Sequence, residues 1–234
     1  MKAIITGASK GIGKAIAFKL ASDGIHLILT ARNFSELDLL KQEIHKEHPN
    51  IQVSIYTADL SNRAEVEKLI EDVFAQHQDL NILINNAGIY KQGDISNGDE
   101  SILEEMMEVN LYAPIHISRG LLPILQKNKG SHIFNICSIA GLDPYPRAGM
   151  YSISKFAMQG FSRCLREELK EKGIKVCTIY PGATWSNSWE GSDLPASRIM
   201  QASDVAEVIS MSIKLSPSAV LEEITLRPQL GDLP

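Results

Sequence analysis

Short apolar runs alternate with longer amphipathic stretches along the whole chain. This alternation is typical of successive β-α units that build a parallel sheet. Within residues 64–76, apolar side chains recur from Val66 to Phe74 at the spacing of one helical face, which predicts a helix lying on a sheet. The apolar runs predict strands at residues 3–6, 26–30, 52–58, 82–85, 131–137, 175–180 and 220–226. The amphipathic stretches predict helices at residues 14–22, 35–47, 64–76, 103–126, 151–171 and 204–213.

This order of elements predicts an α/β fold, in which a doubly wound sheet of seven mostly parallel strands is flanked by helices on both faces. With 234 residues, 44% of them hydrophobic, the chain is long enough to form one domain, residues 1–234, around a large core. Gly24 and Gly173 each follow a predicted helix and suit the left-handed residue that closes a helix end. Residues 182–201 lack clear periodicity, and because so long a loop is usually functional, we expect it to cover a substrate; a disordered insertion is the alternative.

The net charge and the first residues of the chain narrow the expected partners and the expected location of the protein. The formal net charge is −5 and no basic stripe stands out, so nucleic acid is not expected as a partner. A glycine at position 7 comes before a signal peptide's apolar core could form, and no apolar run approaches the roughly 20 residues that span a membrane. We therefore expect a soluble, cytoplasmic protein with no membrane partner.

Neither the cysteines nor the histidines predict a metal site. Cys137, Cys164 and Cys177 lack the close spacing of zinc ligands and cannot all pair, so we expect three buried thiols in a reducing compartment. His45 and His48 lie within one helical turn, but a proline follows them directly. A solvated helix end is the simpler interpretation of this pair.

The first predicted strand runs directly into a glycine-rich loop, Thr6-Gly-Ala-Ser-Lys-Gly-Ile-Gly13, and then into a helix. Glycines permit a tight turn and the close approach of a pyrophosphate, whose charge would meet the free N–H groups and the positive dipole end of the helix. With the strand before it and the helix after it, the loop predicts dinucleotide binding. A purely structural glycine turn is the alternative.

Tyr151 and Lys155 stand four residues apart in a predicted helix, so their side chains share one face. A phenol is a weak acid at neutral pH, and a neighbouring cation favours its phenolate form. The pair therefore suits proton transfer. Taken alone, a core tyrosine beside a surface lysine would be the simpler interpretation.

The pair does not stand alone, because the chain resembles the classical short-chain dehydrogenase/reductases over essentially residues 2–226. The shared motifs occur in order and at family-like spacing: the glycine-rich loop, Asn85-Asn86-Ala87-Gly88, Asn110, Ser138, the Tyr-x-x-x-Lys pair and Pro181-Gly182. The resemblance implies a Rossmann-like fold and an oxidoreductase that transfers a hydride between a nicotinamide cofactor and a carbonyl or secondary alcohol substrate. Relatives pair through their fourth and fifth helices, so residues 103–126 and 151–171 predict a homodimer or homotetramer.

The resemblance also implies roles for four candidate catalytic residues. The tyrosine matching Tyr151 exchanges a proton with the substrate oxygen, and Ser138 would hold the same oxygen. Lys155 would hydrogen-bond the nicotinamide ribose and favour the phenolate. Asn110 would bind a water that links Lys155 to solvent; the alternative is a helix-kinking polar residue with no catalytic part.

Further residues match the family's cofactor contacts. Asp59 and Leu60 would contact the adenine, and the segment after the fourth strand would lie beneath the adenine ribose. Ser186 keeps a hydroxyl where many relatives have a threonine that contacts the carboxamide. The full expected set is Gly7, Ser9, Lys10, Gly11, Ile12, Gly13, Arg32, Asp59, Leu60, Asn86, Ala87, Gly88, Tyr151, Lys155, Pro181, Gly182, Thr184 and Ser186.

Cofactor choice can be argued from the end of the second predicted strand. Leu29-Thr30-Ala31-Arg32 offers no carboxylate for the ribose 2′-hydroxyl of NAD. The guanidinium of Arg32 could instead grip a 2′-phosphate through two charge-assisted bonds, and Lys10 could add a second cation. NADP(H) is therefore favoured over NAD(H). Two solvated surface cations are the alternative.

Two other classes of protein share part of this set of motifs. A non-catalytic sensor or scaffold that binds NADP(H) would tolerate loss of the serine or tyrosine, and here Asn110, Ser138, Tyr151 and Lys155 are all present. Sugar-nucleotide epimerases of the extended branch need an added substrate domain, for which the chain has no room. Trp185 and Trp189, in the aperiodic loop, close over a substrate, or they pack against the loop base or a neighbouring subunit. The identity of the substrate does not follow from these residues.

Overall fold

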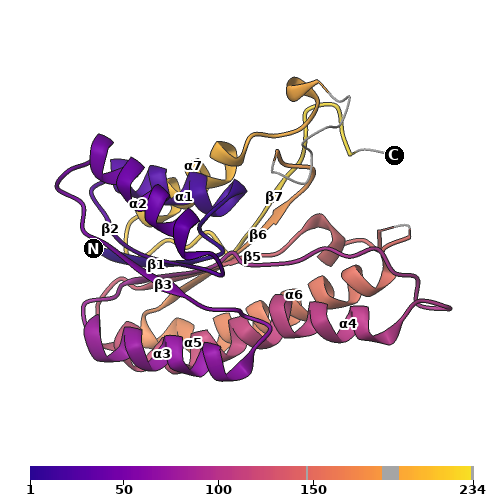
Figure 1. Ribbon diagram of the computed structural model, residues 1–234, viewed down its shortest axis with the longest axis horizontal. Coiled ribbons are helices and arrows are strands. Elements are labelled where there is room, and N and C mark those ends of the chain that lie inside the picture. The colour runs from indigo at the N-terminus through magenta and orange to yellow at the C-terminus, as the bar shows by residue number, and fades with distance from the viewer. Residues whose placement is uncertain (146, 186–194, 233–234) are drawn as a thin grey trace.

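A seven-stranded sheet runs through the middle of the molecule (Figure 1). The computed structural model describes residues 1–145, 147–185 and 195–232. The strands lie in the order β3-β2-β1-β4-β5-β6-β7, and every neighbouring pair is parallel. Their bounds are β1 Lys2–Thr6, β2 His26–Ala31, β3 Val53–Thr57, β4 Ile82–Asn85, β5 His132–Ile136, β6 Lys175–Pro181 and β7 Glu223–Leu226. The predicted α/β fold with a doubly wound sheet is confirmed.

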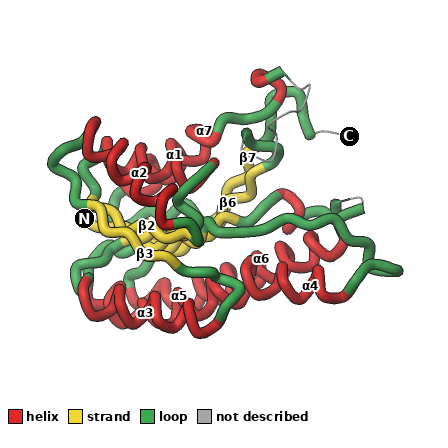
Figure 2. Tube along the Cα trace, in the orientation of Figure 1, coloured by secondary structure: helices red, strands yellow, loops and turns green. Residues whose placement is uncertain are grey.

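Helices cover both faces of the sheet (Figure 2). One face carries α1 (Gly11–Ser22), α2 (Phe34–Glu47) and α7 (Ala202–Ile213). The other face carries α3 (Arg63–Gln76), α5 (Ala113–Lys127) and α6 (Gly149–Leu169), with α4 (Glu100–Met107) packed against α6. Short helical turns are η1 (Glu108–Tyr112), η2 (Ile139–Gly141), η3 (Lys170–Lys172) and η5 (Ala196–Arg198).

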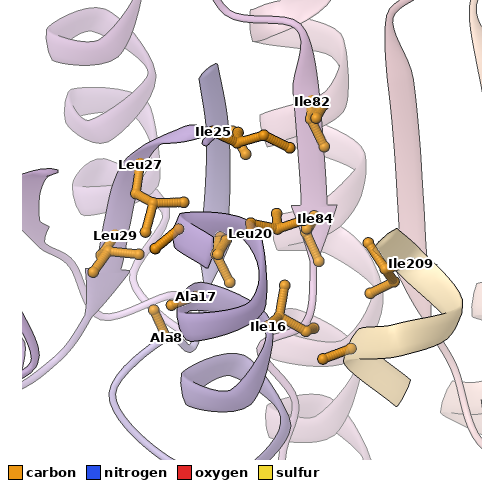
Figure 3. Packing of buried hydrophobic residues seen from close by; sticks show 14 of the residues in the cluster. Ala8, Ile16, Ala17, Leu20, Ile25, Leu27, Leu29, Ile82, Ile84 and Ile209 are labelled. Carbon is orange, nitrogen blue, oxygen red and sulfur yellow. The ribbon is translucent and has the colours of Figure 1, made fainter. Parts of the chain in front are cut away.

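Burial on both faces explains why the strands are nearly continuous apolar runs. In β1, Ile4 belongs to the cluster under α3 and α5, whereas Ile5 belongs to the cluster under α1 and α7. Figure 3 shows the second cluster, with Ile16 of α1 beside Ile84 of β4 and Ile209 of α7. Because each fully buried aliphatic side chain contributes about 1.5–3 kcal/mol, the two clusters hold the strand ends in fixed positions.

The prediction of one continuous helix over residues 103–126 is wrong. The stretch 103–126 divides into α4, the π-helical turn η1 and α5, with Asn110 in the middle of η1. A π-helical turn takes in one extra residue and is frequent at functional sites. The amphipathic pattern continues through the turn, so periodicity alone predicts one helix. The two expected helix-closing glycines do adopt left-handed backbone, with φ of +81° at Gly24 and +74° at Gly173.

The cysteine prediction is correct for two residues and wrong for the third. Cys137 and Cys177 are buried, and burial raises the pKa of both thiols, that of Cys177 to about 12. Cys164 is exposed. It lies off the α6 stripe that faces the sheet, which runs through Met158 and Leu165. Among the described residues, no helix is long and apolar enough to cross a membrane.

Candidate active site

The glycine-rich loop after β1 is held tightly against the segment after β4. Gly7 has φ of +63°, and a Cβ there would lie 2.8 Å from the Cα of Ala87. A Cβ on Gly13 would lie 2.6 Å from Nδ2 of Asn86. The Asn86 amide donates to the carbonyls of Thr6 (2.8 Å) and Gly7 (3.1 Å). Only glycine at these two positions permits the close approach of the loop to the segment after β4.

A cavity of about 600 Å³ opens beside this loop, at the carboxyl ends of β1, β2, β3 and β4. The residues predicted to bind the adenosine half and the pyrophosphate line it: Gly7, Ser9, Lys10, Gly11, Ile12, Gly13, Arg32, Asp59, Leu60, Asn86, Ala87 and Gly88. No side chain caps the start of α1, and its first turn holds no acidic residue. The free N–H groups and positive dipole end of α1 therefore face a cavity suited to an anion.

Charged side chains border the cavity at the end of β2. Lys10 Nζ lies 2.7 Å from Oε1 of Glu36, on the first turn of α2. Arg32 is exposed and has neither an ion-pair nor a hydrogen-bond partner among the described residues. The pKa of Asp59 is lowered, chiefly by the N–H of Ser61 and also by the charge of Arg32. Arg32 is thus a cation available to a ligand in the cavity.

Tyr151 and Lys155 lie on one face of α6, as their spacing predicts. Lys155 Nζ is 5.7 Å from the centroid of the Tyr151 ring and donates to the carbonyl of Ile136 at 3.4 Å. Lys155 is only 4% exposed, yet no carboxylate of the described residues forms an ion pair with it. A Cβ on Gly88 would lie 3.4 Å from this ammonium. A buried cation without a carboxylate is costly, which is a reason to expect a polar ligand beside it.

Asn110 connects the segment after β4 to α6. Its Oδ1 accepts from the N–H of Ile89 (2.8 Å), and its Nδ2 donates to the carbonyl of Ile89 (3.0 Å) and to Oγ of Ser154 (3.0 Å). Ser154 Oγ in turn donates to the carbonyl of Tyr151 at 2.7 Å. Protein acceptors thus engage both N–H groups of the Asn110 amide. The predicted contact of Asn110 with a water stays a prediction.

Ser138 follows β5 at the start of η2. Its Oγ accepts from the N–H of Ala140 at 3.1 Å. The preceding residue, Cys137, donates from Sγ to the carbonyl of Lys155 at 3.3 Å, which joins the end of β5 to α6. A Cβ on Gly141 would lie 2.8 Å from this sulfur. The structure therefore brings Ser138 to the helix that carries Tyr151.

The segment after β6 holds the residues expected at the nicotinamide carboxamide. Pro181 ends β6, and Gly182 N–H donates to the carbonyl of Leu226 at 2.8 Å. Thr184 donates from Oγ1 to the carbonyl of Gly182 at 2.9 Å. Trp185 N–H donates to the carbonyl of Met200. Ser186 and Trp189 lie outside the described residues, as does much of the expected substrate loop, and the role of Trp185 stays a prediction.

Comparison with known proteins identifies the family. The family model described as short chain dehydrogenase matches residues 1–193 of the chain. The chain belongs to the short-chain dehydrogenase family. This membership agrees with the resemblance in the sequence motifs.

Curated relatives and solved structures that are similar to this chain cover nearly all of it. A diacetyl reductase [(S)-acetoin forming] of Staphylococcus epidermidis is 32% identical over 218 residues, covering 91% of this chain and 84% of the relative. A sepiapterin reductase of Chlorobaculum tepidum is 28% identical over 238 residues, covering 98% and 97%. The structure of an alcohol dehydrogenase from the archaeon Thermococcus sibiricus, complexed with 5-hydroxy-NADP, aligns with a TM-score of 0.90 at 27% identity and covers 100% of this chain and 98% of that one.

The residues at the site that were not predicted include Glu36, Ser154 and Tyr90. Glu36 and Ser154 make the contacts given above. The exposed ring of Tyr90 stands edge-on to that of Tyr151, with centroids 5.1 Å apart and an interplanar angle of 79°. Tyr90 stands two residues after the Asn-Asn-Ala-Gly motif, and Ser154 directly precedes Lys155. Their positions beside these motifs could have indicated Tyr90 and Ser154, whereas no feature of the sequence indicated Glu36.

Proposed function

We propose that the protein is an NADP-dependent oxidoreductase that reduces a carbonyl compound, or oxidises the matching secondary alcohol, with Tyr151 as the acid-base group. The observation that carries the proposal is the buried ammonium of Lys155, which has no carboxylate among the described residues, lies beside the Tyr151 ring and borders Gly88 at the edge of the cavity. The proposal takes residues 1–234 as one catalytic domain.

A dinucleotide fits the residues present. The close glycine contacts and the uncapped start of α1 suit a pyrophosphate, and the cavity beside them has room for an adenosine. When bound, the nicotinamide supplies or accepts the hydride. Lys155 and the backbone around Gly182 and Thr184 would orient that end of the cofactor.

The chain's own residues would move and hold the proton. In reduction, the phenol of Tyr151 donates its proton to the carbonyl oxygen as negative charge develops there. The hydroxyl of Ser138 donates a hydrogen bond to the same oxygen. The Lys155 cation stabilises the phenolate that remains. Asn110 and Ser154 hold the helical turn of Tyr151 in place through their hydrogen bonds.

Charged side chains beside the ends of β1 and β2 support the proposed preference for NADP(H). Arg32 lines the cavity without a partner among the described residues, and Lys10 lines it four residues after Thr6. A guanidinium and an ammonium at this place suit a 2′-phosphate. Solved structures of similar proteins complexed with NADP, NADP+ or NADPH support the same choice.

The names of the relatives support a carbonyl substrate. A diacetyl reductase and a sepiapterin reductase are both named for reduction.

We also propose that the protein is cytoplasmic and forms a homodimer or homotetramer. Exposed apolar side chains on η1 and α6, namely Tyr112, Ile153 and Phe156, support self-association. Sedimentation should therefore give more than the monomer mass; a monomer at micromolar concentration would contradict this part.

The test of the function is a spectrophotometric screen of carbonyl compounds with NADPH, read at the reduced-nicotinamide band. We expect oxidation of NADPH with at least one ketone or aldehyde. Calorimetric titration with NADPH runs beside the screen. Tight binding without turnover across a broad panel would favour a non-catalytic sensor, and absence of binding would overturn the proposal altogether.

A further inference from the structure

The cavity wall near Arg32 contains a carboxylate as well as two cations. Glu36 lines the same cavity as Lys10 and Arg32, and its Oε1 lies 2.7 Å from Lys10 Nζ. A 2′-phosphate held by both cations would lie next to this carboxylate. The site that we propose for NADP(H) therefore contains one group of the wrong charge for it.

Local structure places Glu36 there firmly. Asn33 caps α2, and its side chain accepts from the N–H of Glu36 at 3.2 Å. A carboxylate in the first turn of a helix is favoured by the helix dipole. The Glu36 side chain is about one-third exposed (32%), and that of Lys10 about half exposed (54%). The pair is therefore partly screened by water, and its effect on a ligand should be moderate.

Glu36 is charged at neutral pH. The pKa of its carboxyl is lowered, chiefly by Lys10, while Ser9 and Arg32 lower it further and partial burial opposes them. A dianionic phosphate and this carboxylate would compete for the same ammonium. NADH has only a 2′-hydroxyl at that position, and this hydroxyl can donate a hydrogen bond to a carboxylate.

We propose that Glu36 sets the balance between NADPH and NADH by weakening the hold on the 2′-phosphate. This inference rests on the proposed function, since it takes the cavity as the dinucleotide site. Selectivity is a difference between two affinities, and a group that repels one ligand changes it as surely as a group that attracts the other. Arg32 and Lys10 act for NADPH, and Glu36 acts against it.

Glu36→Gln tests the proposal because it removes the charge and keeps the size of the side chain. Dissociation constants for NADPH and NADH are measured by calorimetry on the purified full chain. We expect Glu36→Gln to bind NADPH about three- to tenfold more tightly, at about 1.4 kcal/mol per tenfold, and to bind NADH no more tightly than wild type. The gain should shrink as salt is raised, because the charges are partly exposed. Adenosine 2′,5′-bisphosphate and ADP, as shorter probes, should show the same contrast.

Glu43→Gln is the matched control. Glu43 lies on the same helix, pairs with Lys14 at 2.6 Å and is similarly exposed at 36%, but it does not line the cavity. This variant should leave both dissociation constants within twofold of wild type. If Glu43→Gln tightens NADPH as much as Glu36→Gln does, net charge alone explains the change and the proposal is overturned. Glu36→Asp, which keeps the charge, should stay closer to wild type than Glu36→Gln.

The failure of this proposal can be told apart from failure of the function. If wild type binds NADPH and Arg32→Ala weakens it, but Glu36→Gln changes nothing, then only the inference about Glu36 is wrong. If wild type binds neither dinucleotide, the proposed function is wrong and the inference falls with it. A melting curve for each variant shows that the protein measured is folded.

Discussion

The two ends of the proposed cofactor site are held in different ways. At the adenosine end, Lys10, Arg32 and Glu36 are at least partly exposed, and they act through charge. At the catalytic end, Asn110, Ser154 and Lys155 are buried. Hydrogen bonds join Asn110 to Ser154 and Ser154 to the carbonyl of Tyr151.

This difference predicts how each end responds to change. Exposed charges are screened by water and salt, so each one shifts affinity moderately and can be exchanged without disturbing its neighbours. Buried polar groups have no water to replace a lost partner, so a change at one leaves another unsatisfied. We therefore expect substitutions at the adenosine end to change the preference between NADPH and NADH without disturbing neighbouring groups. Substitutions at the catalytic end should instead lower the rate of proton transfer.

The largest effect is expected for Lys155→Met. The apolar side chain removes the only cation that the structure describes beside the Tyr151 ring, so the phenolate loses its stabilisation. We expect the turnover rate to fall about 10²-fold or more, and NADPH affinity to fall as well. Steady-state kinetics and calorimetry measure the two effects. Lys170→Met, at an exposed position just after α6, is the control and should change neither.

Arg32→Asp is expected to reverse cofactor choice. The carboxylate would repel a 2′-phosphate and accept from a 2′-hydroxyl, so NADPH should bind about 10- to 100-fold more weakly while NADH binding is kept or improved. Titration calorimetry with both dinucleotides measures the ratio. An Arg32→Asp variant that keeps the wild-type ratio of the two affinities would show that Arg32 does not meet the phosphate.

His132 is a buried polar residue at the start of β5, at the opposite end of this strand from Ser138. The pKa of His132 is lowered to about 4, chiefly by burial and also by the charge of Lys175, while its contact with the Gly130 carbonyl opposes this shift. The folded state therefore holds His132 neutral while the unfolded chain takes up a proton below about pH 6.5, so stability falls as pH falls through this window. We expect a loss of about 2 kcal/mol between pH 7 and pH 5 from this residue.

Urea unfolding of wild type and His132→Gln at both pH values measures that loss. The variant should lack most of the pH dependence that His132 contributes, since it has no group that titrates there. If the free energy of unfolding changes equally with pH in the two proteins, His132 is solvated in the folded state.

The smallest effect is expected for Ser154→Ala. The change removes the hydroxyl between Asn110 and the Tyr151 carbonyl, at about 0.5–1.5 kcal/mol, so the turnover rate should fall about two- to tenfold with the Michaelis constant for NADPH little changed. Ser162→Ala is the matched control, because Ser162 is also buried on α6 but bonds Asn135 and Thr178 instead. It should lower stability and leave the turnover rate unchanged.

The strands and the glycine-rich loop could be predicted because their causes are local. Buried parallel strands such as β4 are short apolar runs, and its bounds agree with the prediction. The π-helical turn at Asn110 could not be predicted, because its side chain is held by Ile89 and Ser154, which are distant in sequence. The pairing of Lys10 with Glu36 has the same origin. Family motifs name the site residues, but the contacts between elements decide what stands beside them.

The central claim, that Tyr151 transfers the proton at a site that binds NADPH independently of its hydroxyl, is tested most directly with Tyr151→Phe. For a carbonyl compound that wild type reduces, we expect turnover to fall about 10²–10⁴-fold while the NADPH dissociation constant stays within about twofold. Tyr90→Phe is the control, because it removes the hydroxyl of the adjacent ring. This variant should retain most of the turnover. A Tyr151→Phe variant that retains most of the wild-type rate would contradict the claim.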